Sequence, residues 1–190
     1  RNIPNRLRYD NEFDLVYPID LISVNASADT PDDVETKEEN GNFVIRIGDP
    51  DTTITGRHTY EIVYRVEGAM NGSDSHDELF WNVIGNEWEQ SIGEMNVRVT
   101  APADVTRVAC FDGTFGSTAE CNQAQITKKG DAVFSQSNLP AFEAMSVVVA
   151  LPAGTVASTA PILDERWSLD KAFSRTPVTI GGGTGLLLLV

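Results

Sequence analysis

The sequence predicts an all-β protein whose strands form an antiparallel β-sandwich of the immunoglobulin-like or a related type. Short runs of apolar side chains alternate with polar ones, most clearly at residues 60–66 and 79–83. This period of two places each set of side chains on one face of a strand. Comparable runs recur at intervals of about ten residues, with turn-forming residues between them and no long helical period. At 190 residues the chain is long enough to bury a core without support from a metal.

The first strands are expected at residues 13–24 and 43–47. Residues 13–24 carry apolar side chains on both faces, and Pro18 marks an edge or a bulge because proline cannot donate a ladder hydrogen bond. An acidic stretch then ends in Asn40-Gly41, the usual two-residue turn of a β-hairpin. This turn leads directly into the alternating strand at residues 43–47.

Residues 57–92 contain the strongest structural signal in the chain. The alternating runs at residues 60–66 and 79–83 are separated by a polar loop that holds two glycines. We predict that these two runs pair as a hairpin with a long acidic turn. Residues 95–99 follow as the next strand, and Pro102 ends it.

The second half of the chain has signals for four more strands and one helix. The strands are expected at residues 105–110, 124–127, 132–136 and 143–151. One face of the last strand is formed by Met145, Val147, Val149 and Leu151. Residues 163–173 have the apolar spacing of a short C-terminal helix, and Asp164 is placed to cap it.

The composition restricts the class of partner. The chain has 28 acidic and 14 basic residues, and its net charge is −14. Such a surface repels phosphate backbones and anionic lipid head groups, so we expect no nucleic-acid partner. We interpret the acidity as a property that keeps the protein soluble rather than as a cation site.

Cys110 and Cys121 bracket a loop of mostly small and polar residues, FDGTFGSTAE. Two thiols are too few for a closed zinc site, and their spacing differs from the C-x-x-C of thioredoxin-like proteins. A structural disulfide is therefore favoured over a pair of free thiols. Closing so short a loop contributes about 3 kcal/mol in the chain-entropy model, and a disulfide would place the domain in an oxidising compartment.

We divide the chain into three parts. Residues 1–155 form the β-sandwich domain, residues 156–180 an arm beside the membrane that contains the short helix, and residues 181–190 a glycine-rich linker. The linker runs into Leu-Leu-Leu-Leu-Val, which we interpret as the start of a transmembrane helix of about 20 residues; the alternative is a flexible tail. The chain begins with RNIP, without an initiating methionine or a signal peptide, so we expect a processed or shortened chain.

His76, Asp77 and Glu78 stand at the base of the acidic loop, close to Asp74. Carboxylate oxygens at close spacing suit a hard cation such as calcium, and the same cluster is a candidate proton site. Turn chemistry is the favoured interpretation, because Asp caps turns and Glu78 begins a strand. Three consecutive residues cannot form the relay of a catalytic triad, which excludes that interpretation of Ser75, His76 and Asp77.

Trp88 lies in a turn and is a candidate platform for a sugar or a peptide. Trp81 shares the parity of Leu79 and is assigned to the core instead. Asp49 and Asp51 are weak calcium candidates, since they do not follow the spaced D-x-[DN]-x-[DN]-G pattern. The sequence contains no motif of a serine hydrolase, a zinc protease or a phosphate-binding loop.

Four segments carry a resemblance to a known family. They read R-N-I-P at 1–4, I-R-I-G-D-P-D at 45–51, G-R-H-T-Y-x-I-x-Y-x-V at 56–66 and H-D-E-L-F-W-N-V-x-G-x-x-W at 76–88. These residues resemble domain-of-unknown-function family 2207, the YciQ-like predicted bacterial membrane proteins. The resemblance implies a signal peptide, a β-rich domain outside the cytoplasm and then transmembrane helices. It also implies that the family's opening strands, which precede residue 1, are absent from this sequence, and it brings no catalytic residue.

These observations predict a non-catalytic ectodomain of a membrane-anchored protein, which binds a protein or a component of the cell envelope. We expect this domain at the cell membrane, on the extracytoplasmic side. Two alternatives are kept open. One is a hydrolase that uses Asp77 and Glu78, whose carboxylates would have to converge in a pocket. The other is an adhesive module stabilised by calcium, which would melt at a higher temperature with calcium than with a chelator.

Overall fold

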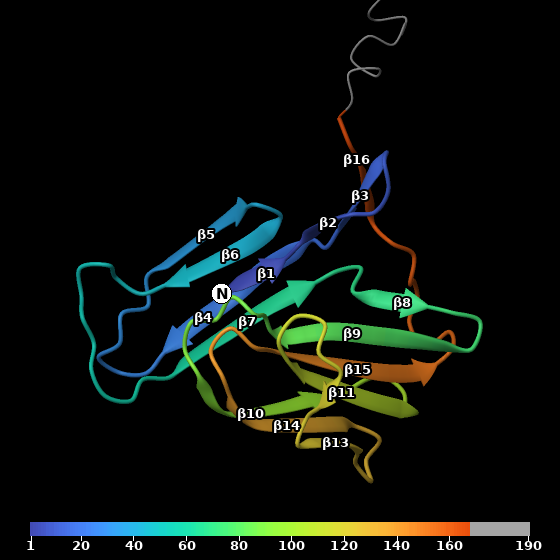
Figure 1. Cartoon of the computed structure of the whole chain (residues 1–190). Coiled ribbons are helices and arrows are strands. Elements are labelled where there is room, and N and C mark those ends of the chain that lie inside the picture. The colour runs from blue at the N-terminus through green and yellow to red at the C-terminus, as the bar shows by residue number, and fades with distance from the viewer. Residues whose placement is uncertain (168–190) are drawn as a thin grey trace, which may run out of the picture.

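The computed structural model describes residues 1–167, and these residues contain sixteen β-strands and no helix (Figure 1). The first seven strands are β1 (Asn2–Pro4), β2 (Arg6–Arg8), β3 (Phe13–Val16), β4 (Ile19–Ala26), β5 (Val34–Glu39), β6 (Asn42–Ile47) and β7 (Tyr60–Val66). The others are β8 (Met70–Gly72), β9 (His76–Ile84), β10 (Ile92–Val99), β11 (Arg107–Gly113), β12 (Ala119–Glu120), β13 (Gln123–Ile126), β14 (Ala132–Leu139), β15 (Ala144–Pro152) and β16 (Leu163–Glu165). Every strand pair is antiparallel, so the prediction of an antiparallel all-β fold is confirmed.

Two sheets share the main hydrophobic core in a sandwich-like arrangement. One has five strands in the order β12-β11-β15-β9-β8, and the other has three in the order β10-β14-β13. Figure 1 shows β10, β14 and β13 along the bottom of the molecule, beside the five-stranded sheet. Phe134 and Leu139 are buried from the three-stranded sheet, and Met145, Val147 and Val149 from the five-stranded one. The buried face predicted for residues 143–151 is therefore confirmed.

Three smaller sheets are built from the N-terminal strands and the end of the described chain. Their strand orders are β1-β6-β5, β16-β3-β2 and β4-β7, and Figure 1 shows β5, β6 and β1 at the upper left, away from the main core. Asn40 and Gly41 connect β5 to β6 with φ angles of 53° and 75°, so the predicted two-residue turn is confirmed. Ile3 and Ile45 are buried and give this region a small core of its own.

Strand β9 positions the candidate residues. It pairs with β15 on one side and with β8 on the other, so that Leu79 lies opposite both Val149 and Met70. Side chains alternate along the strand, and one face is directed inward. On this face Asp77 is buried, and three apolar side chains pack against the core: Leu79, Trp81 and Val83. The opposite side, which we call the outer face of β9, carries His76, Glu78, Phe80 and Asn82.

The predicted hairpin between residues 60–66 and 79–83 is wrong. Strand β7 pairs with β4, while β9 pairs with β8 and β15. The polar loop contains β8, which forms its own short hairpin with β9, closed by a 2.9 Å hydrogen bond from Ser73 N to His76 O. Alternation indicates which side chains share a face. It does not fix the partner strand, because the backbone hydrogen bonds of a ladder are the same for every sequence.

The predicted helix at residues 163–173 is wrong over the residues that the structure describes, because residues 163–165 form strand β16. This strand lies along β3, with Leu163 opposite Leu15, and a 2.7 Å ion pair joins Arg6 to Asp164. Pairing with the free edge of β3 satisfies more backbone groups than one helical turn would. Residues 168–173 and the predicted linker at residues 181–190 lie outside the described residues.

Cys110 and Cys121 form a disulfide, with their Cα atoms 5.4 Å apart. Cys110 lies on β11 within the core, and Cys121 follows β12, where the chain crosses to β13 of the other sheet. The bond therefore ties β11 to the start of the segment that crosses between the two sheets. Next to the disulfide, the side chain of Gln136 on β14 connects Asp112 to Asn122. Its Nε2 donates to Asp112 Oδ2 at 2.7 Å, and its Oε1 accepts from Asn122 N at 2.8 Å.

Candidate functional site

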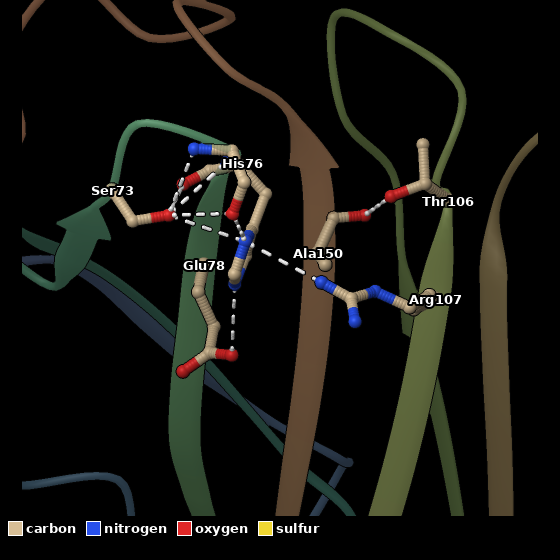
Figure 2. A network of polar contacts seen from close by, with 7 residues as sticks. Ser73, His76, Glu78, Thr106, Arg107 and Ala150 are labelled. Carbon is tan, nitrogen blue, oxygen red and sulfur yellow. Dashed lines mark hydrogen bonds and ion pairs between the residues drawn. The ribbon is translucent and has the colours of Figure 1, made fainter.

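His76 is the centre of a polar network at one end of the five-stranded sheet (Figure 2). Its Nδ1 lies 2.8 Å from Ser75 Oγ, 3.2 Å from Ser73 Oγ and 3.4 Å from Arg107 Nη2. Its Nε2 lies 3.6 Å from Glu78 Oε2. A proton on Nε2 suits these partners, because Nδ1 then accepts from the hydroxyl and guanidinium groups while Nε2–H faces the carboxylate.

The His76 network joins three parts of the sheet. His76 and Glu78 come from β9 and Arg107 from β11, with β15 between them, as Figure 2 shows. Cross-strand register explains the meeting, since Ala150 of β15 lies opposite both Glu78 and Arg107. Two charges of opposite sign and one imidazole are thus paired with each other on a half-exposed surface, where such pairs contribute at most about 1 kcal/mol each.

Asp77 lies on the other side of the sheet from its two neighbours. It is 4% exposed, and its Oδ2 accepts a 3.1 Å hydrogen bond from Val156 N. This contact holds the segment after β15 against β9. Because Asp77 and Glu78 point to opposite faces of one strand, their carboxylates do not converge, and the pair cannot act together on a substrate as the hydrolase alternative requires.

The other acidic candidates belong to turns. Asp49 Oδ1 accepts from Asp51 N at 2.9 Å, and Oδ2 accepts from Thr52 Oγ1 at 2.7 Å. These hydrogen bonds, that of Thr52 first, lower the pKa of the Asp49 carboxyl group. Asp74 is exposed in the turn between β8 and β9. Within residues 1–167, no group of three or more His, Cys, Asp or Glu side chains is placed to hold a metal ion, and calcium binding stays a prediction.

Trp88 lies in the connection between β9 and β10 and is 44% exposed, whereas Trp81 packs against the core. The sequence separated these two tryptophans correctly, Trp81 by its parity and Trp88 by its place in a turn. The carbonyl group of Trp88 accepts a 2.8 Å hydrogen bond from Phe142 N, which fixes the connection against the loop before β15. Trp88 borders a hollow of about 310 Å³ between this connection, β1 and the end of β9.

A second hollow, of about 330 Å³, lies on the outer face of the five-stranded sheet. Phe80 and Phe115 line it and are 48% and 94% exposed. The two hollows share Asn82, Gly85 and Asn86, and we refer to them together as the β9 groove.

The sequence did not predict the β9 groove. Its aromatic members could have been found in part, because Phe80 is out of phase with Leu79 and Trp81 and so had to face outward. Its polar members could not, because Asn2, Asn42 and Asn82 come from β1, β6 and β9 and meet only in the folded chain.

Together these features define a disulfide-linked, all-β domain with an open groove on its five-stranded sheet. The family model for the N-terminal domain of a predicted membrane protein (DUF2207) matches residues 2–151, and the chain belongs to this family. The family is one of unknown function, so the match locates the domain in a membrane protein and assigns no activity. No curated protein and no solved structure matches the chain. Among residues 1–167 there is no helix long and apolar enough to cross a membrane.

Proposed function

We propose that this domain is the extracytoplasmic recognition module of its membrane protein, and that it binds a protein or a component of the cell envelope without catalysing a reaction. The family supports the membrane location. The Cys110–Cys121 disulfide supports a location on the extracytoplasmic side of the membrane, because disulfides persist in oxidising compartments.

The observation that carries this proposal is the exposure of aromatic side chains around the β9 groove. Phe80, Trp88 and Phe115 each expose a large part of their surface there. Exposed aromatic side chains gathered at a concave surface are typical of a binding site, where they supply contact area at low entropic cost. The charges of the His76 network are paired with one another, and none of its residues lines the groove.

Sedimentation with isolated cell envelopes tests this proposal. The 190-residue chain should sediment with the envelope fraction, and the double variant F80S/F115S should lose most of this binding because both aromatic contacts are removed. Ile22→Ser is the matched control, since Ile22 is 57% exposed on β4, away from the groove.

Three outcomes are informative. Retained binding by F80S/F115S would move the site away from the β9 groove. Equal loss in Ile22→Ser would mean that binding is a general property of exposed apolar surface. Absence of binding by the unmodified chain would contradict the proposal itself.

A further inference from the structure

The half of the β9 groove next to Trp88 has an unusual chemical lining. It is lined by four asparagines and Trp88, together with two residues of opposite charge and two apolar residues: Asn2, Asn42, Asn82 and Asn86, then Arg1 and Glu87, then Pro4 and Ile84. These side chains reach the hollow from β1, β6, β9 and the connection after β9. A hollow of about 310 Å³ thus combines one aromatic residue and four uncharged amides with one basic and one acidic residue, whose charges are opposite.

We propose that the β9 groove binds a neutral oligosaccharide, with its non-polar sugar face on Trp88 and its hydroxyl groups on the surrounding amides. Each asparagine amide both donates and accepts, as each sugar hydroxyl does, so amides match a polyol better than charged groups would. An indole ring offers its electron-rich face to the weakly positive C–H groups on one side of a sugar ring. This proposal rests on the proposed function and names the class of envelope component.

The walls of the hollow are held in place before any ligand arrives. Arg1 Nη2 donates to Val83 O at 2.8 Å and to Asn82 O at 3.3 Å, which attaches the start of β1 to β9. Asn2 Nδ2 donates to Glu87 Oε2 at 3.1 Å across the hollow. Binding to preorganised polar groups loses less conformational entropy than binding to mobile ones.

Asn82 stands where the two hollows meet. Its Oδ1 accepts a 2.6 Å hydrogen bond from Ser146 Oγ, and this bond fixes the orientation of the amide. The Nδ2 group of Asn82 can then donate to a ligand. The second hollow continues from Asn82 along Phe80 and Phe111. A groove with two adjoining hollows and an aromatic side chain in each fits a ligand of several linked sugar units rather than one sugar.

Two observations argue against other ligands of extended shape. A peptide that adds a strand needs a free sheet edge. Strand β9 is paired on both sides, by β8 and by β15, and β1, the one groove strand at a sheet edge, is only three residues long. The net charge of −14 repels an acidic polysaccharide or a nucleic acid. Neither observation disfavours an uncharged glycan.

Two-dimensional amide NMR of the 190-residue chain tests the proposal, with tetrasaccharides of glucose and of N-acetylglucosamine as the probes. We expect saturable shifts of the Asn82 and Asn86 side-chain amides and of the Trp88 indole N–H with at least one probe. Trp88→Ala should weaken this binding at least about ten-fold, because the stacking ring is lost. Trp88→Phe should restore part of the affinity. Trp167→Ala is the control, since Trp167 is 76% exposed outside the groove, and it should bind as the unmodified chain does.

The outcomes separate this proposal from the broader one. Absence of shifts with both tetrasaccharides up to about 10 mM would overturn the oligosaccharide proposal. If the chain still sedimented with envelopes in an F80S/F115S-sensitive manner, the recognition function would stand with another ligand. If envelope binding were absent as well, both proposals would fall. Shifts by a neutral peptide in the same amides, without shifts by sugars, would likewise overturn the assignment to a glycan.

Discussion

Reduction of the Cys110–Cys121 disulfide should lower the stability of the domain by an amount that can be estimated in advance. The two cysteines are 11 residues apart. For a closed loop of this size, the chain-entropy relation gives about 2.8 kcal/mol at 25 °C. In a domain of this length, 1 kcal/mol corresponds to roughly 2–4 °C in melting temperature, so reduction should lower the midpoint by roughly 6–11 °C.

The assay is thermal unfolding followed by circular dichroism, with and without reductant, together with a count of titratable thiols. Reduction is a cleaner perturbation than mutation, because Cys110 is only 3% exposed and its sulfur atom stays in the core. The double variant C110A/C121A provides the control. It should melt near the reduced protein, slightly lower because one buried and one partly buried sulfur atom are missing, and reductant should not change its midpoint.

One result would refute this reasoning. If the protein had two titratable thiols after reduction and still melted within about 1 °C of the oxidised form, the loop would already be restricted in the unfolded chain. The disulfide would then add no stability to the segment that it ties to β11.

Three further predictions concern the core, the buried carboxylate and an exposed turn. Phe134→Ala should reduce the free energy of unfolding in urea by about 3–5 kcal/mol, because a fully buried ring is replaced by a cavity. Asp77→Ala should reduce it by about 1.5–3 kcal/mol at neutral pH, because Val156 N–H loses a charged acceptor. Thr52→Val should raise the pKa of Asp49 in an NMR titration, because the hydroxyl group that stabilises its carboxylate is removed. The folded pKa of Asp49 is the lowered one, so its stabilising effect is present above the unfolded pKa and is lost as the pH falls through the folded value.

Matched variants give each of these predictions a control. Ile126→Ala removes an apolar side chain that is 40% exposed on β13, so it should cost far less than the change at Phe134. Glu78→Ala changes the half-exposed neighbour of Asp77 and should cost about 0.5 kcal/mol or less. Equal effects within either pair would contradict the assignment of inner and outer faces on which both predictions depend. An unchanged pKa of Asp49 in Thr52→Val would show that the backbone hydrogen bond alone accounts for its shift.

The local features of this fold could be predicted from sequence because they depend on near neighbours. Alternation identified the buried face of β15, and Asn40-Gly41 identified the β5–β6 turn, since both are decided within a few residues. Which strands pair with each other could not be predicted in the same way. Strand β7 lies on β4 and β16 on β3 because those edges were free to pair, and that fact belongs to the assembled fold.

The candidate site shows the same division. The partial exposure of Trp88 followed from its place in a turn, and the core position of Trp81 from its parity. The His76 network could not be completed from the sequence, because Arg107 is 31 residues from His76 and reaches it across β15. The amide lining of the β9 groove was hidden for the same reason, since its members lie on strands far apart in the chain.

Hydrogen–deuterium exchange of the 190-residue chain, with and without isolated cell envelopes, is the most direct test that the β9 groove is the functional surface. Envelopes should slow exchange in two segments that border the groove, residues 80–88 and 111–117, and leave β5 and β13 unchanged. Protection confined to β5, β13 or another part of the chain, with none at these two segments, would contradict the account.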